Sequence, residues 1–183
     1  MYKRQAYAFL DQDAPDTANP SLWRDTQLNH IYGLFEVTDG IYQVRGYDMS
    51  NVTFIKGDTG WIVVDPLMSV ECAQAALALV EENLGTFPVK AVIYSHSHVD
   101  HFGGVKGVVS EEEVQAGNVQ VIAPEGFEKH AVSENIYAGT AMGRRASYQY
   151  GTMLEGGETG SLAIGIGMGQ SKGCLLYTSD AAD

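Results

Sequence analysis

The sequence YSHSHVDHFGG, residues 94–104, holds three of the chain's five histidines and one aspartate within six positions. It continues the apolar run VKAVIYSH, residues 89–96, which is typical of a strand buried on both faces. The four motif residues are His96, His98, Asp100 and His101. In open α/β sheets, ligands bind beyond the carboxyl ends of strands. The sequence therefore predicts a functional site in the loop that follows this strand.

A helix is predicted immediately before this strand. The sequence MSVECAQAALALVEENLG has Ser69 as an N-cap, continues with strong helix formers and ends at Gly85, which predicts a helix at about 69–84. The run GWIVVDP, residues 60–66, precedes the helix and is typical of a strand. Strand, helix and strand together predict a βαβ unit that ends at the motif residues.

The segments further upstream predict a sheet and an N-terminal arm. GIYQVRG at 40–46, NVTFIKGD at 51–58 and GWIVVDP are short β-rich runs separated by Gly, Asp and Asn, which favours a meander of antiparallel strands. Residues 1–35 include DQDAPDTANPSLW and are rich in Pro, Asp and Asn. We expect an extended arm or loop there that covers the core rather than forming it.

The four motif residues suit metal binding. Side chains alternate along an extended backbone, so His96, His98 and Asp100 share a face, and His101 follows from the turn. Glycines 103 and 104 allow a tight fold behind them. Imidazole nitrogen and carboxylate oxygen suit zinc, manganese or iron, and four such ligands within six residues favour two metal ions sharing the loop. A purely structural role for this cluster is disfavoured, because without a cation it would crowd imidazoles whose protonated forms repel one another.

The composition restricts the class of protein. The chain has 183 residues, of which 45% are hydrophobic and 19% charged, as expected for one globular domain. A net charge of −12, from 23 acidic and 11 basic residues, disfavours nucleic acid as a partner. No run approaches the ~18 apolar residues of a membrane span, and no signal peptide is evident. Cys72 and Cys174 predict neither a disulfide framework nor a zinc ribbon.

HSHVDH resembles the HxHxDH motif of the metallo-β-lactamase superfamily, and GWIVVDP resembles a strand of that fold that ends in a structural aspartate, here Asp65. The resemblance implies an α/β fold, a metallo-β-lactamase-like αββα sandwich of which only the N-terminal part is present. It also implies a dinuclear metal site between the two sheets. In that site His96 and His98 bind one metal, and Asp100 and His101 bind the other.

Longer stretches resemble the zinc-dependent alkyl sulfatases, which hydrolyse detergents of the dodecyl sulfate type. They are GLFEVTDGIYQVRGYDMSNVTFIKGDTGWIVVDPL, SHSHVDHFGGVKGVV and NIYAGTAMGRRASYQYG, within a resemblance that runs from about Trp23 to Gly173. This resemblance implies two zinc ions, a small-molecule alkyl sulfate substrate hydrolysed by metal-activated water, and a homodimer formed through a region absent here. It names no catalytic or substrate-binding side chain in this chain.

The resemblance places the remaining metal ligands, carboxylates and a further histidine, downstream of the matched region. Neither His130 nor Glu155 nor Glu158 matches a ligand position of the family. His30 and His130, taken singly, are interpreted as structural residues. Arg144 and Arg145 either face a sulfate or lie on a solvated helix, and their surroundings favour the helix.

The expected organisation is an N-terminal arm at 1–35, a partial catalytic domain at 36–173 and a non-native tail at 174–183. MYKRQ, residues 1–5, and the tail CLLYTSDAAD both look like translated adapter sequence. Residues 156–173 hold seven glycines and are interpreted as a loop flanking the site.

Two functional hypotheses remain open. The first is an alkyl sulfatase represented by an incomplete fragment, with this truncated chain itself inactive. The second is a non-catalytic metal-binding fragment whose sheet exposes an apolar face that is normally covered. Other hydrolases with the same motif, such as thioesterases, lactonases and β-lactamases, are a further alternative to the sulfatase. The sequence does not set the localisation, and the family's frequent export by bacteria is compatible with a periplasmic or secreted protein.

Overall fold

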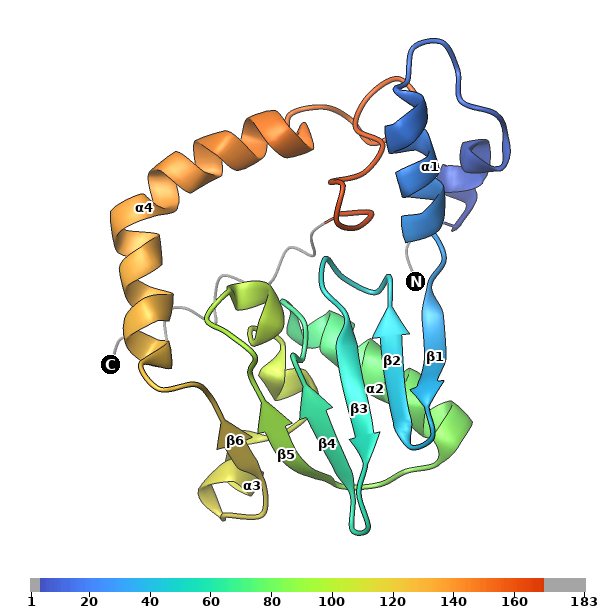
Figure 1. The fold of residues 1–183 in the computed structure, drawn as a ribbon. Helices are drawn as coiled ribbons and strands as arrows, with labels where there is room; N and C mark the ends of the chain where they lie inside the picture. Colours follow the sequence, from blue (N-terminus) through green and yellow to red (C-terminus); the bar gives the residue numbers. More distant parts are fainter. Residues whose placement is uncertain (1–3, 170–183) are drawn as a thin grey trace.

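One six-stranded mixed sheet forms the centre of the molecule, in the order β1-β2-β3-β4-β5-β6 (Figure 1). The computed structural model describes residues 4–169 of the chain. The strands are β1 Gly33–Thr38, β2 Ile41–Arg45, β3 Val52–Lys56, β4 Trp61–Val64, β5 Val89–Ile93 and β6 Gln120–Ile122. Strands β1 to β4 form an antiparallel meander, and β4, β5 and β6 run parallel. The predicted meander and βαβ unit are confirmed, whereas β1 and β6 are strands that the sequence does not predict.

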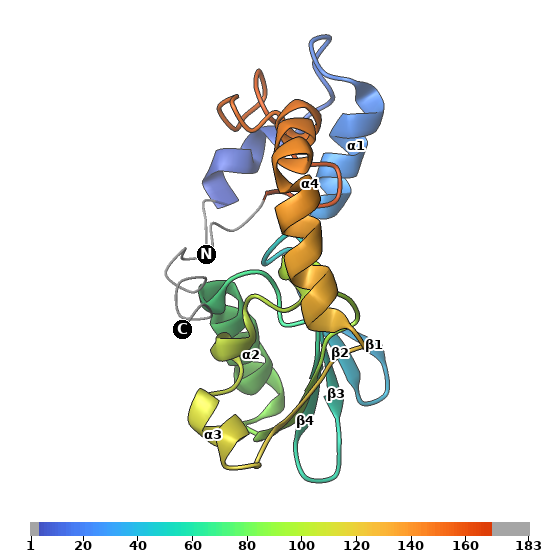
Figure 2. The same cartoon turned by 90° about the vertical axis from the view of Figure 1, so that its left-hand side faces the viewer.

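Helix α2, Val70–Leu84, joins β4 to β5 with the ends that the sequence predicts. The Ser69 hydroxyl accepts a hydrogen bond from the backbone N–H of Cys72, and Gly85 ends the helix with a φ of 90°. The helix lies against one face of the sheet (Figure 2). The buried residues of the core are Val44, Val52, Phe54, Trp61, Val63, Leu67, Ala73, Ala76, Val80, Val92, Val108 and Val119.

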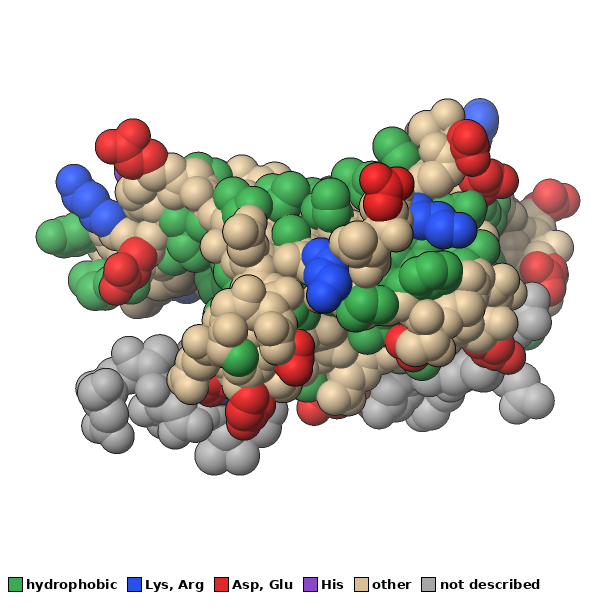
Figure 3. All heavy atoms as spheres, turned by 90° about the horizontal axis from the view of Figure 1, so that it is seen from below, with side chains coloured by type: hydrophobic (Ala, Val, Ile, Leu, Met, Phe, Trp, Pro, Cys, Tyr) green, Lys and Arg blue, Asp and Glu red, His purple; other side chains and the backbone are tan. Residues whose placement is uncertain are grey.

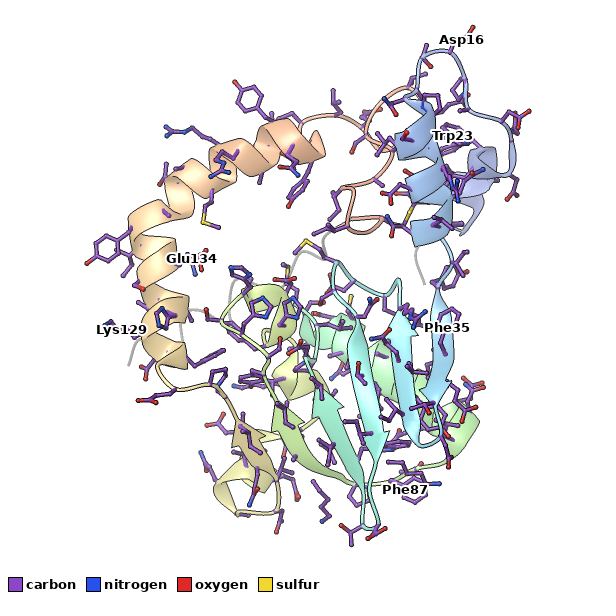
Figure 4. All side chains as sticks on the ribbon, viewed as in Figure 1. Asp16, Trp23, Phe35, Phe87, Lys129 and Glu134 are labelled. Carbon is purple, nitrogen blue, oxygen red and sulfur yellow. The ribbon has the colours of Figure 1, made fainter. Side chains whose placement is uncertain are left out.

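An aromatic group closes the lower end of this core. Trp61 is fully buried and packs edge-to-face against Tyr42, Phe54 and Phe87, with ring centroids 5.8–6.1 Å apart. Phe87 lies at the lower end of the sheet in Figure 4, and the Lys56 ammonium lies 5.2 Å from its ring centroid. This aromatic end of the sheet is opposite the end that carries the motif residues, because Trp61 begins β4 and the motif follows the end of the parallel strand β5.

The opposite face of the sheet is only half-buried. Ile41, Ile55, Ile62, Val64 and Ile93 pair across this face and remain partly exposed. Within residues 4–169 the strands form one sheet, so the described part supplies one half of the expected αββα sandwich. The apolar face that the second hypothesis requires is present, but it is half-buried rather than exposed.

The lower surface of the molecule shows how charge is distributed. Apolar side chains gather there, and acidic side chains surround them more often than Lys or Arg (Figure 3). This surface carries no basic stripe, in agreement with the net charge of −12. Among the described helices, none combines the length and the hydropathy that crossing a membrane requires.

The N-terminal arm is more structured than predicted. A 3₁₀-helix, η1, covers Arg4–Asp11, and a helix, α1, covers Pro20–Asn29, so the expectation of an extended arm or loop is wrong over those residues. The Asn19 side chain caps α1 by accepting from the next helical N–H groups, and Pro20 occupies the first turn. The expected boundary between residues 35 and 36 falls inside β1.

The arm packs against the last described segment of the chain. Trp23, labelled in Figure 4, forms a small second cluster with Leu10 and Leu162, and its indole N–H donates to the Gln12 carbonyl at 3.0 Å. The Asn29 amide donates to the carbonyl of Gly165 at 3.3 Å. Part of the glycine-rich loop at 156–173 is thus held against α1, and the predicted tail at 174–183, with Cys174, lies outside the described residues.

Two further helices follow the motif. Helix α3 covers Glu111–Gln115, and helix α4 covers Phe127–Tyr150 and arches over the carboxyl ends of the parallel strands β4, β5 and β6 (Figure 1). None of the residues of α4 is buried. Arg144 and Arg145 are exposed on it, which confirms the solvated-helix interpretation.

Candidate metal site

Two parallel strands bring the site together. Val64 of β4 pairs with Ile93 of β5, so the residues that follow each strand emerge at the same edge of the sheet. Asp65 follows β4 directly, and its N–H donates to the Ile93 carbonyl at 3.0 Å. Ser95 and the motif residues follow β5. The topology therefore explains why residues 30 positions apart meet.

Asp65 is the centre of the hydrogen bonds at this edge. Its Oδ1 accepts the backbone N–H of Ser95 at 2.8 Å, and its Oδ2 accepts the Ser95 hydroxyl at 2.6 Å. His101 Nδ1 lies 2.9 Å from the same Oδ2. Because an ionised carboxylate only accepts hydrogen bonds, His101 Nδ1 donates in this contact, and the other ring nitrogen, Nε2, faces Asp100.

The same contacts orient His96. The Ser95 hydroxyl lies 2.8 Å from His96 Nδ1. Since the hydroxyl donates its single proton to Asp65, it accepts from His96 Nδ1–H, and Nε2 of His96 is left with its lone pair. Asp65 thus fixes the ring orientation of two histidines, of His101 directly and of His96 through Ser95.

The backbone at Asp65 is unusual. Asp65 and Leu67 have φ values of 57° and 64°, a left-handed conformation that costs a non-glycine residue on the order of 1–3 kcal/mol. Fixed neighbours hold it, because the Leu67 side chain is fully buried and its carbonyl accepts the Gly104 N–H at 2.9 Å. Such conformations concentrate at functional sites.

Glycines bring the motif loop against this turn. The 3₁₀-helices η2, Val99–His101, and η3, Val105–Gly107, follow the strand end. A Cβ at Gly103 would clash with the Met68 carbonyl oxygen, and one at Gly104 would clash with the Pro66 carbonyl oxygen. The tight fold expected from these two glycines is therefore present, and its reason is close backbone approach.

The structure brings the four motif residues together in two pairs, and in each pair two atoms that can bind a metal face each other. His96 Nε2 lies 3.0 Å from His98 Nδ1, and His101 Nε2 lies 3.1 Å from Asp100 Oδ2. The imidazole rings of His96 and His101 also lie side by side, with centroids 4.2 Å apart. The four side chains converge, but Asp100 lies in η2 and meets His101 rather than sharing one extended stretch with His96 and His98. The expected alternation is therefore wrong for Asp100, and the role of the four residues as metal ligands stays a prediction.

The chemistry of these pairs fits metal ions. Two nitrogen ligands at ~2.0–2.1 Å from a tetrahedral zinc ion lie about 3.3 Å apart, close to the separation within each pair. With its proton on Nδ1, His101 presents an unprotonated nitrogen to the Asp100 carboxylate, and two facing acceptors require a proton or a cation between them. Metal binding meets this requirement by replacing the proton.

Two ligand side chains do not complete a zinc site. Among residues 4–169, no three His, Cys, Asp or Glu side chains are placed to hold one ion together. Zinc sites use three or four protein ligands. A zinc ion at either pair would therefore need further ligands from other groups.

Three residues near the motif were not predicted from the sequence. The Ser50 hydroxyl donates to the backbone carbonyl of Asp100, and Asp48 accepts the Met68 N–H at 3.2 Å. Glu134 of α4 lies 3.3 Å from His98 Nε2. Asp48 and Ser50 lie between two predicted strands, where loops carry functional groups, but nothing in the spacing of the three residues links them to the motif.

The other candidate residues lie away from the motif. His30 ends α1, and its ring packs against Tyr7 and Tyr32 with centroids 5.6 and 5.8 Å away, which confirms the structural interpretation. His130 is exposed on α4. Glu155 and Glu158 are exposed in the loop after α4.

A cavity of about 240 Å³ adjoins the loop between β2 and β3. Its lining combines apolar and polar groups, including Phe35, Arg45, Asp48, Met49 and Ile166. Arg45 is already engaged, because its guanidinium lies 4.9 Å from the Phe35 ring centroid and its Nε donates to Gln43 at 2.6 Å. Asp48 belongs both to this lining and to the support of the turn between β4 and α2, where it accepts the Met68 N–H.

Comparisons with known proteins agree with this geometry. The family profile of the metallo-beta-lactamase superfamily matches residues 45–179. A linear primary-alkylsulfatase from a Pseudomonas species is 57% identical over 171 residues, 92% of this chain and 25% of that protein. The alkyl/aryl-sulfatase BDS1 of Saccharomyces cerevisiae is 51% identical over 93% of this chain and 27% of its own length.

A solved structure shows the same fold. The stereoselective inverting sec-alkylsulfatase Pisa1 from a Pseudomonas species superposes with a TM-score of 0.82 at 53% identity, over 90% of this chain and 26% of that one. The chain therefore spans about a quarter of the length of these relatives. The yeast relative shows that such sequences are not confined to bacteria.

Proposed function

We propose that this chain carries the metal-binding loop of an enzyme that hydrolyses alkyl sulfate esters. The chain belongs to the metallo-β-lactamase superfamily and, within it, to the alkylsulfatase family. The observation that carries the proposal is the pairing of donor atoms at the carboxyl end of β5, in a chain more than half identical to named alkylsulfatases. Two zinc ions are the proposed cofactors, with His96 and His98 on one, and Asp100 and His101 on the other.

The chain's own residues have defined tasks in this proposal. Asp65 and Ser95 hold the imidazoles of His96 and His101 in the tautomers that present Nε2. Ser50 holds the backbone of Asp100. A bound divalent metal ion would supply a Lewis acid that offsets sulfate charge and lowers the pKa of bound water toward about 7. Dimerisation and export, which the family resemblance also suggests, stay separate predictions.

A non-catalytic metal-binding role is the second candidate. It is favoured by the half-exposed sheet face and by the two-ligand pairs, which leave each ion short of protein ligands. This candidate predicts zinc binding without sulfate release.

The test uses the 183-residue chain. Bound zinc is measured by elemental analysis, and sulfate and alcohol release are measured with dodecyl sulfate, in wild type and in the double variant His98→Ala, Asp100→Ala. Turnover that the double variant loses together with its zinc supports the sulfatase. Zinc without turnover is expected both of a non-catalytic fragment and of a sulfatase whose remaining metal ligands lie outside these residues, so the same assay on the intact gene product decides between the two. A chain that retains no zinc contradicts both candidates.

The substrate class is tested by parallel assays with a β-lactam and a thioester. These compounds are substrates of other enzymes that share the motif. We expect no cleavage of either compound by a chain that releases sulfate. Cleavage of one of them in place of dodecyl sulfate would contradict the proposed substrate.

A further inference from the structure

His98 differs from the other two motif histidines in how its ring is held. His96 and His101 each direct Nδ1 to Ser95 or Asp65, at the strand ends of the sheet. The His98 side chain is 53% exposed, against 23% for His101, and its Nδ1 is the atom that faces His96 Nε2. Its Nε2 therefore needs a partner from elsewhere if the ring is to keep this orientation.

Glu134 is the partner that the structure supplies. Both carboxylate oxygens of Glu134 lie 3.3 Å from His98 Nε2, although the two residues are 36 positions apart. Figure 4 shows the Glu134 side chain extending from α4 toward the upper end of the sheet. A carboxylate at this distance accepts a hydrogen bond from Nε2–H and stabilises the tautomer whose Nδ1 lone pair is available.

Packing at the start of α4 fixes the position of Glu134. Phe127, the first residue of α4, packs against Tyr94 and Phe102 with ring centroids 5.3 and 5.0 Å away. Tyr94 precedes the motif and Phe102 follows it, and their own rings are 5.7 Å apart. Glu134 lies seven residues after Phe127, two helical turns along the same face. The aromatic contact therefore places the carboxylate above the motif loop.

We propose that Glu134 is a positioning residue of the metal site: it accepts a hydrogen bond from His98 Nε2–H and so presents His98 Nδ1 to the metal. The inference rests on the metal site of the proposed function and not on its sulfate substrate. Carboxylates that orient a ligand histidine from outside the coordination sphere typically contribute about 10–100-fold in metal affinity. None of the residues of α4 is buried, so this hydrogen bond would be a direct contact between the helix and the metal site.

Zinc affinity of the full chain tests this role. Competition with a chromophoric chelator is used for wild type, Glu134→Ala, Glu134→Gln and Glu128→Gln. Glu128 is an exposed residue of the same helix. Glu128→Gln is therefore the control that removes one negative charge, as Glu134→Gln does, at a position without a contact to His98. We expect Glu134→Ala to weaken zinc binding by about 10–100-fold, Glu134→Gln to weaken it less because its amide oxygen still accepts, and Glu128→Gln to match wild type.

A spectroscopic readout separates positioning from general stability. In zinc-loaded chains with ¹⁵N-labelled histidine, we expect a slowly exchanging Nε2–H signal for His98 in wild type, and its loss by exchange with water in Glu134→Ala. Alanine is the best helix former, so α4 should remain folded, as circular dichroism will show.

The outcomes separate the inference from the proposed function. Unchanged zinc affinity and an unchanged His98 signal in Glu134→Ala would overturn the inference and leave the metal site standing. An equal loss of affinity in Glu128→Gln would also overturn it, because net charge alone would then explain the effect. A wild-type chain that binds no zinc would overturn the metal site and the inference together.

Discussion

At the scale of single residues, one carboxylate organises the site. Asp65 receives hydrogen bonds from Ser95 and His101 and holds His96 through the Ser95 hydroxyl. Its left-handed backbone directs the side chain across the strand ends rather than along the chain. A residue outside the motif can therefore decide how two of the predicted ligands are oriented.

Replacing Asp65 by Asn tests this role without straining the turn. Asn tolerates the left-handed conformation as well as Asp does, but its amide has one acceptor oxygen in place of two. We expect zinc affinity to fall by about 10–100-fold while the urea midpoint changes little. Chelator competition measures the affinity, with Asp58→Asn on an exposed turn as the control. Equal affinities in the two variants would contradict the role of Asp65.

At the scale of helices and strands, the sequence predicted those elements whose start, end or burial depends on residues close together in the chain. The cap at Ser69, the stop at Gly85 and the apolar run into β5 each depend on residues close in sequence, and all three are seen. Strand β6 is three residues long and exposed, so it has no clear pattern, and helix α1 was missed although Asn19 and Pro20 mark its start.

The same limit applies to the site. The four motif residues lie within six positions, so their convergence could be predicted, although the 3₁₀-helix η2 and not strand alternation sets Asp100 beside His101. Ser50 and Glu134 lie 50 and 36 positions from their partners, Asp100 and His98. Only the tertiary arrangement of the β2–β3 loop and of α4 brings them to the motif. Local pattern carries no information about such pairs.

A pair of glycine substitutions tests the close approach of the motif loop. A methyl group at Gly104 would meet the carbonyl oxygens of Pro66 and Ser69, whereas one at Gly143 of α4 meets nothing within 4 Å. We expect Gly104→Ala to destabilise the chain by about 1–3 kcal/mol through overpacking. Gly143→Ala should stabilise it by about 0.5–1 kcal/mol. Urea unfolding measures both, and a Gly104→Ala variant as stable as wild type would show that the loop can move away.

A second pair tests the two faces of β4. Val63 is fully buried against α2, and its neighbour Ile62 lies on the half-exposed face. We expect Val63→Thr to cost about 1–3 kcal/mol because it buries a hydroxyl without a partner. Ile62→Thr should cost less, because water can reach its hydroxyl. Equal losses of unfolding free energy would show that both faces are covered in solution.

At the scale of the whole molecule, a rigid lower half supports a less densely packed upper half. The buried core lies between the sheet and α2, whereas α4 buries none of its residues and the arm packs in a separate small cluster. Helices in proteins owe most of their stability to tertiary packing. The motif loop lies where these two halves meet (Figure 1).

Zinc should therefore stabilise the entire chain. An ion that binds only the folded state at a hundredfold excess over its Kd adds about 2.7 kcal/mol. For a chain of this size that corresponds to a Tm increase of about 5–10 °C. Calorimetry with and without zinc, and after chelation, measures the increase. The double variant His98→Ala, Asp100→Ala should show none, and an equal increase in that variant would place the zinc elsewhere.

The seven-residue interval between Phe127 and Glu134 has a consequence for how this segment can change during evolution. One amino acid inserted or deleted between them turns everything downstream by about 100° around the helix axis. The aromatic anchor would stay in place while the carboxylate swung away from His98. Substitutions on the outer side of this stretch should thus accumulate freely among descendants of the gene, whereas changes in its length should be rare.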